Sequence, residues 1–132
     1  MDTSFVILIT ASIQKTQSHL TAIKFVKELL KQNKRIRSVF FYQDGVSVGN
    51  DYCIPPSDEP QLTQQWAALA DLHAIELQTC VAASLRRGIV DKESAKENSL
   101  NAANLNSSFK MTGLGQLAAA MSEQSSKLIH FK

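Results

Sequence analysis

The sequence predicts a three-layer α/β fold, in which helices cover both faces of a parallel sheet. Strand-like segments alternate along the chain with helix-like segments, and this alternation favours parallel pairing through right-handed crossovers. The first strand-like segment is apolar at nearly every position, as strands buried on both faces are. The chain has 132 residues, of which 44% are hydrophobic and 20% charged, and we expect residues 1–132 to form a single domain.

The N-terminal part is expected to form a strand, a loop and an amphipathic helix. Residues Ser4–Thr10 (SFVILIT) are apolar and β-branched, which favours a buried strand. Residues Ala11–Ser18 are rich in Ser, Thr and Gln and are expected to form a loop. A helix ending near Asn33 is expected next, because apolar residues recur at helical spacing. These residues are Leu20, Ile23, Val26, Leu29 and Leu30.

A second strand is expected at Ile36–Tyr42 (IRSVFFY), followed by a turn at Gln43–Gly45. Residues 44–60 are rich in glycine and proline and are expected to form a long irregular loop, which in a compact domain is usually functional or mobile. A helix is expected to begin around Ser57–Pro60, where proline and acidic residues suit a first turn, and to bury Trp66.

A third strand is expected at Ile75–Thr79 (IELQT), where apolar and polar residues alternate. Its polar face predicts that this strand lies toward a sheet edge or beneath a partner. Residues Val81–Arg87 are expected to form a short helix that stops at Gly88. Asp91 is expected to cap a further short helix with the sequence KESAKE.

The C-terminal part is expected to contain a surface loop, a helix and a last strand. Residues Asn98–Ser108 are rich in Asn and Ser and predict the loop. Residues Thr112–Met121 include LAAAM and predict the helix. Residues Lys127–Phe131 (KLIHF) predict the last strand, so that the residue pattern identifies four strands.

Charge, apolar runs and potential metal ligands exclude several classes of protein. The net charge of +2 is too small to indicate nucleic-acid binding. The longest apolar run, Phe5–Ile9, is far shorter than the ~20 residues of a membrane span, and no basic segment precedes it as in a secretory signal. The histidines lack metal-ligand spacing, and two cysteines cannot form a structural zinc site alone. We therefore expect a cytoplasmic protein with no metal, no cofactor, no direct nucleic-acid binding and no membrane partner.

Cys80 carries the strongest chemical signal, because it follows a predicted strand and directly precedes a predicted helix. Backbone N–H groups and the positive end of the helix dipole stabilise a thiolate at such a position. On the predicted strand, Cys80 shares a face with Glu76 and Gln78. The other interpretation is a small buried core residue, since free cysteines are often fully buried. Position alone does not separate the two.

Other chemistries at the predicted strand ends are less well supported. Cys80–Arg86 matches C-x5-R, the anion-binding loop of cysteine phosphatases, but the five residues between them lack glycine and favour a helix. Such a helix takes Arg86 out of reach of the thiol. Thr10–Ser12 begins a hydroxyl-rich loop that lacks the glycine patterns of nucleotide-binding loops. Cys53 is either a resolving thiol or an incidental loop residue.

Over nearly its full length the chain resembles the TusD/DsrE family of sulfurtransferase subunits. The most specific part of the resemblance is the block CVAASLRRGIVD, Cys80–Asp91. The matching segments are SVFFYQDGV (Ser38–Val46), SDEPQLTQQW (Ser57–Trp66), IELQTCVAASLRRGIVD (Ile75–Asp91) and an NL…F…GLGQLA run (Asn104–Ala118). The resemblance implies a three-layer α/β domain with a five-stranded, mainly parallel sheet.

The resemblance also implies a function in sulfur relay. Cys80 is implied to carry a persulfide, with sulfur accepted from a TusA-like carrier and passed to a TusE-like acceptor for 2-thiolation of the tRNA wobble uridine. The implied assembly is a heterohexamer with TusB- and TusC-like subunits. The alternatives are a DsrE-like subunit in sulfur oxidation and a non-catalytic assembly subunit in which Cys80 is structural.

The residues agree with such a relay. Serial displacement between thiols needs one accessible nucleophilic thiol and a docking surface, without a metal or an acid–base pair. The loops at 44–60 and 98–108 offer surfaces without core-forming residues. We therefore expect the chain to work in an assembly, with the surroundings of Cys80 shielded at a subunit interface.

Overall fold

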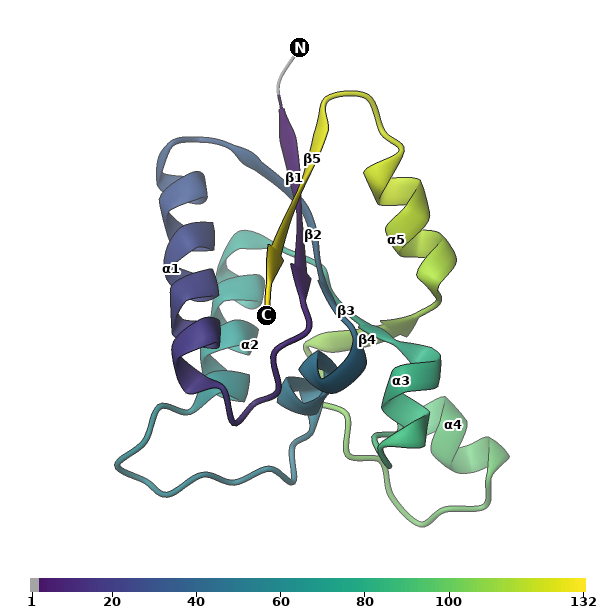
Figure 1. Cartoon of the computed structure of the whole chain (residues 1–132). Coiled ribbons are helices and arrows are strands. Elements are labelled where there is room, and N and C mark those ends of the chain that lie inside the picture. The colour runs from purple at the N-terminus through teal and green to yellow at the C-terminus, as the bar shows by residue number, and fades with distance from the viewer. Residues whose placement is uncertain (1–2) are drawn as a thin grey trace.

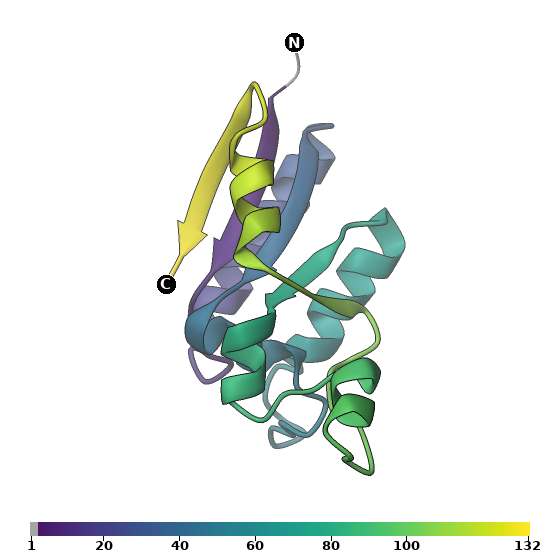
Figure 2. The ribbon, with the colours of Figure 1, turned by 90° about the vertical axis from the view of Figure 1, so that its right-hand side faces the viewer.

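The computed structural model describes residues 3–132 and confirms the three-layer α/β architecture. The middle layer is a five-stranded sheet in the order β4-β3-β2-β1-β5, and every neighbouring pair of strands is parallel. Figure 1 shows α1 and α2 on one side of the sheet and α5 on the other. In the turned view of Figure 2, α5 lies in front of the sheet, while α1 and α2 lie behind it.

The strands and helices follow the predicted order, with one additional strand and one additional 3-10 helix. The strands are β1 (Ser4–Ile9), β2 (Arg35–Phe41), β3 (Leu77–Cys80), β4 (Phe109–Thr112) and β5 (Ser126–Phe131). The helices are α1 (Thr16–Lys31), the 3-10 helix η1 (Gln43–Gly49), α2 (Leu62–His73), α3 (Val81–Arg86), α4 (Lys92–Glu97) and α5 (Leu114–Met121). Across residues 3–132, none of the helices is long and apolar enough to cross a membrane.

The core lies on both faces of β1 and β2, as the apolar sequence of the first strand predicts. Val6 and Ile7 of β1 are fully buried. Trp66 of α2 is also fully buried, and its ring meets that of Phe41 edge-on, with 5.3 Å between the ring centroids. This contact fixes α2 against the same face of the sheet as α1.

Two local signals placed the ends of helices correctly. Asp91 caps α4, because its carboxylate accepts a hydrogen bond of 2.8 Å from the backbone N–H of Ser94. Gly88 follows the C-terminal end of α3 with φ of +74°, in the left-handed region that glycine enters without a steric penalty. The helix α3 therefore ends, and α4 begins, where the sequence predicts.

The sheet contains one strand more than the residue pattern predicts. The residue pattern identified four strands and missed β4, which occupies Phe109–Thr112. Thr112, expected to be the first residue of the last helix, thus belongs to a strand, and α5 begins at Leu114. With only four residues, β4 is too short for alternation to stand out from its polar surroundings. It forms one edge of the sheet, and Lys110 on it is exposed, as is common on edge strands. The five strands implied by the family resemblance are confirmed.

The surroundings of β3 and η1 also differ from expectation. The third strand was expected toward a sheet edge or beneath a partner and to be partly exposed; it lies next to the edge strand β4, and all four residues of Leu77–Cys80 are buried. The segment expected to be an irregular loop from residue 44 begins instead with the 3-10 helix η1. Gly45 permits this turn, since a Cβ there would lie 2.2 Å from the carbonyl oxygen of Ile9.

Candidate functional site around Cys80

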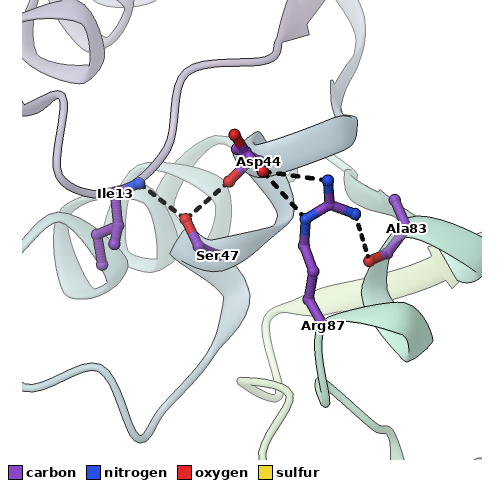
Figure 3. A network of polar contacts seen from close by, with 5 residues as sticks. All are labelled: Ile13, Asp44, Ser47, Ala83 and Arg87. Carbon is purple, nitrogen blue, oxygen red and sulfur yellow. Dashed lines mark hydrogen bonds and ion pairs between the residues drawn. The ribbon is translucent and has the colours of Figure 1, made fainter.

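The carboxyl ends of β1, β2 and β3 lie at one end of the molecule, together with η1 and α3 (Figure 1). Tyr42 N–H donates to the Ile9 carbonyl at 2.9 Å. Ile13 N–H donates to Ser47 Oγ at 2.8 Å, and that hydroxyl donates to the Asp44 carbonyl at 2.8 Å (Figure 3). These bonds join the loop after β1 to the segment after β2. Functional sites of parallel α/β sheets usually lie at this end.

Arg87 connects α3 to η1 at the same end of the sheet. Its Nε and Nη2 atoms each lie 3.1 Å from Asp44 Oδ1, and Nη1 donates to the Ala83 carbonyl at 3.0 Å (Figure 3). Arg86 is exposed at the last position of α3. The segment after Cys80 is thus a regular helix, as predicted, and not the anion-binding loop of a cysteine phosphatase.

Cys80 is the last residue of β3 and the N-cap of α3, with an extended backbone (φ −63°, ψ 125°). Its strand-to-helix position is the one that the sequence predicts. Position alone left a reactive thiol and a buried core residue both open, and in the chain by itself Cys80 is only 3% exposed. The reason is that β2 and β4 flank β3 on either side while α3 begins at the very next residue.

Cys80 faces the side of the sheet that α5 covers. Phe41 and Thr79 are register neighbours, and Phe41 packs against Trp66 of α2, so Thr79 faces the α2 side. Alternate residues of a strand point to opposite faces. Cys80 and its register neighbour on β4, Thr112, therefore point to the opposite side.

Three hydroxyls close to Cys80 in sequence or in register are buried and lack hydrogen-bond partners among residues 3–132. They are Thr79 Oγ1, Ser84 Oγ and Thr112 Oγ1. Buried polar groups normally have partners, because an unmade hydrogen bond is costly in a low-dielectric interior. Sequence reasoning missed these hydroxyls. Thr112 was hidden with β4, and a serine inside a short helix carries no distinctive signal.

The remaining candidates do not join Cys80 in a site. Cys53 lies in the segment after η1, is half-buried, and is a free thiol like Cys80. Its side chain lines a cavity of about 330 Å³ together with Ile13 and Pro55, whereas Cys80 does not. Within residues 3–132, no group of three or more His, Cys, Asp or Glu residues could hold a metal ion.

His19 is a buried structural residue on α1. Its Nε2 lies 2.8 Å from the Ala11 carbonyl, and its Nδ1 accepts a 3.1 Å hydrogen bond from Trp66 Nε1. A carbonyl only accepts and an indole N–H only donates, so this pair of contacts fits the neutral ring protonated at Nε2. Desolvation by burial lowers the pKa of His19, although the backbone hydrogen bond to Ala11 acts in the opposite direction.

Comparison with known proteins gives a consistent result. The sequence pattern of the DsrE/DsrF-like family matches residues 3–131. The sulfurtransferase TusD of Proteus mirabilis is 44% identical over 121 residues, which cover 92% of this chain and 93% of that protein. A TusD homolog of Vibrio cholerae is 46% identical over 109 residues, or 83% of each chain.

A solved structure agrees at the level of the fold. The crystal structure of the ychN protein from E. coli superimposes with a TM-score of 0.73 and covers 99% of this chain and 100% of its own. Its sequence identity is 16%. This likeness supports the three-layer architecture and the all-parallel sheet described above.

Proposed function

This chain belongs to the DsrE/DsrF-like family and is a sulfurtransferase with a role in sulfur relay, and we propose that Cys80 carries the transferred sulfur as a persulfide. The supporting observation is the position of Cys80 at the carboxyl end of a parallel strand and at the start of α3. The first backbone N–H groups of a helix are not used within it. At this junction no side chain of the described residues caps α3, which starts at Val81 directly after the thiol.

The proposed step is a displacement between sulfur atoms. The Cys80 thiolate attacks the outer sulfur of a donor persulfide, a new S–S bond forms, and the donor's own S–S bond breaks. The electron pair of the broken bond leaves with the donor thiolate. The numbers of S–S bonds before and after the step are equal, so neither an external oxidant nor a metal is required.

We place this step in a relay from a TusA-like donor to a TusE-like acceptor, for 2-thiolation of the tRNA wobble uridine in the cytoplasm. The proposed assembly is a heterohexamer with TusB- and TusC-like subunits. Large apolar side chains on the loops after η1 and after α4 support association, since Tyr52 is 65% and Leu100 is 51% exposed. Partner binding would also reconcile the burial of Cys80 with its proposed role. The thiol is covered in the chain by itself, and the docking of a partner would uncover it.

One observation favours a second candidate. A thiol that is 3% exposed also fits a non-catalytic subunit in which Cys80 is structural, since free cysteines are often core residues. In that case α3 and β4 would keep the thiol out of reach of any donor. The two candidates differ in whether Cys80 acquires sulfur.

Intact-mass measurement separates them. The chain, alone and co-expressed with its TusB- and TusC-like subunits, is incubated with glutathione persulfide. We expect a gain of one sulfur atom that a reductant removes. The gain should be absent in Cys80→Ser and present in Cys53→Ser, the matched variant at the other free thiol. No gain in either preparation of the wild-type chain, or an undiminished gain in Cys80→Ser, would contradict the proposal.

A further inference from the structure

Two of the unpartnered hydroxyls lie close to Cys80, one across the sheet register and one a helical turn further along the chain. Thr112 is the direct register neighbour of Cys80, so its side chain leaves β4 toward the same face. Ser84 lies one helical turn after Cys80 on α3 and belongs to the buried side of that helix. The Ser84 side chain is 0% exposed, and its Oγ has no partner among the described residues.

The resting thiol does not satisfy these hydroxyls. Neither Ser84 Oγ nor Thr112 Oγ1 forms a hydrogen bond to any described atom, the Cys80 sulfur included. A persulfide extends the side chain by a second sulfur about 2 Å beyond Sγ. The outer sulfur of the persulfide therefore extends further from the Cys80 backbone than the sulfur of the empty thiol, which brings it toward these hydroxyls.

We infer that Ser84 and Thr112 form a binding pocket for the transferred sulfur of the Cys80 persulfide. This inference rests on the proposed function of Cys80. Each hydroxyl donates a hydrogen bond to the outer, anionic sulfur once the chain is loaded. Hydrogen bonds to a charged acceptor are the stronger kind, and here they also relieve two buried unsatisfied groups.

The consequence concerns the transfer equilibrium. Loading joins the donor's outer sulfur to Cys80 and releases the donor thiolate. Ser84 and Thr112 stabilise only the product side, because they have no partner before loading. They hold the sulfur on this chain against its return to the donor until an acceptor thiolate attacks the same outer sulfur and Cys80 leaves as thiolate.

The test is the equilibrium constant for loading from a fixed mixture of glutathione persulfide and glutathione, measured by intact mass. Thr112→Val and Ser84→Ala are each expected to lower this constant about tenfold, the effect of one hydrogen bond to a charged group. Thr112→Ser keeps the hydroxyl and should load like the wild type. Alkylation of the empty thiol should be unchanged in all three variants, which a merely structural effect would not leave constant.

Thr79→Val is the matched control. Thr79 is fully buried, its hydroxyl is equally unpartnered, and it adjoins Cys80 in sequence, but it faces the α2 side of the sheet. Its removal should leave the loading constant unchanged. Thr112→Val, Ser84→Ala and Thr79→Val each delete a buried unsatisfied group, so the fold is expected to tolerate them, and thermal unfolding checks this.

The outcomes are distinguishable. A lower loading constant in Thr112→Val and Ser84→Ala, together with an unchanged constant in Thr112→Ser and Thr79→Val, supports the pocket. Wild-type loading constants in both Thr112→Val and Ser84→Ala would overturn the pocket but not the persulfide on Cys80. A loading constant lowered as much in Thr79→Val as in those two variants would do the same. If the wild-type chain itself takes up no sulfur, the proposed function fails and the pocket with it.

Discussion

Arg87 and Asp44 form an ion pair that joins the end of α3 to η1, with Nε and Nη2 of the arginine each 3.1 Å from Asp44 Oδ1. The two side chains are 37% and 70% exposed, so water and salt reduce the pair to about 0–1 kcal/mol. The pair matters for access to the thiol rather than for stability, because α3 starts directly after Cys80. The pair holds the helix that covers the thiol to the segment that follows β2.

Weakening this pair should make Cys80 easier to reach. Arg87→Met and Asp44→Asn are each expected to lower the free energy of unfolding by less than about 1 kcal/mol and to raise the alkylation rate of Cys80 by up to about fivefold. Iodoacetamide labelling in a Cys53→Ser background measures the rate, and urea unfolding measures the stability. The double variant should exceed Arg87→Met by little, since Arg87→Met already removes the ion pair as well as the hydrogen bond to the Ala83 carbonyl. An unchanged rate in both single variants would show that the pair does not hold α3 over the thiol.

The buried imidazole of His19 predicts a loss of stability in acid. Burial lowers the pKa of His19 in the folded chain below its ordinary value of 6.5. As the pH falls through about 6.5, the unfolded chain binds a proton that the folded chain does not, so unfolding becomes more favourable. Above that range the ring is neutral in both states and nothing is lost.

Urea midpoints between pH 7.5 and pH 5.5 measure this effect. His19→Gln removes the titration while keeping an amide that can donate and accept, so its midpoint should fall less over this range than that of the wild type. His73→Gln, at the exposed end of α2, is the matched control and should retain the wild-type decline. Parallel declines in wild type and His19→Gln would contradict the prediction.

Two glycines predict opposite effects of the same substitution. In Gly45→Ala the new Cβ would lie 2.2 Å from the Ile9 carbonyl oxygen, a backbone atom that cannot move without shifting β1. Overpacking of this kind costs about 1–3 kcal/mol or more. In Gly115→Ala, near the start of α5, no described atom apart from the chain neighbours and the backbone of the helix itself lies within 4 Å of the new Cβ, and the better helix propensity of alanine adds up to about 1 kcal/mol.

Thermal unfolding of the two variants checks the prediction, with the midpoint falling for Gly45→Ala and rising or staying constant for Gly115→Ala. Equal midpoints would mean that the close approach between η1 and β1 is not maintained in solution.

The proposed assembly implies that the chain forms a larger particle when it is co-expressed with its partners. We expect the chain to enter a larger particle when it is produced with TusB- and TusC-like subunits, because apolar side chains such as Tyr52 and Leu100 are exposed when it stands alone. Light scattering on the isolated chain and on the co-purified material measures both masses. A monomer in both preparations that still transfers sulfur at full rate would refute the assembly.

Most of the fold follows from local patterns in the sequence. The apolar run at Ser4–Ile9, the cap at Asp91 and the left-handed turn at Gly88 are each determined by residues close in sequence, and these elements were predicted. The β4 strand was not, because its four residues are stabilised by pairing with β3 rather than by their own pattern. Tertiary pairing of this kind overrides weak local signals.

Only the part of the site that depends on residues close in sequence could be predicted. The place of Cys80 between strand and helix is a local property, and the sequence indicated it correctly. Its burial and its neighbour Thr112 depend on β4, so an error in one edge strand concealed both. Residues that meet through sheet register leave no mark at any fixed spacing along the chain.

The pairing of β1 with β5 has a consequence for the order in which the molecule forms. Ser4 is aligned with Ser126, and Ile9 with Phe131, so one side of β1 has no partner until nearly all the described residues have been synthesised. Contacts so distant in sequence slow folding, and an unpaired strand edge is a template for association with other chains. One edge of β1 therefore stays open until β5 pairs with it, and the docking of β5 is the step that closes the sheet on this side.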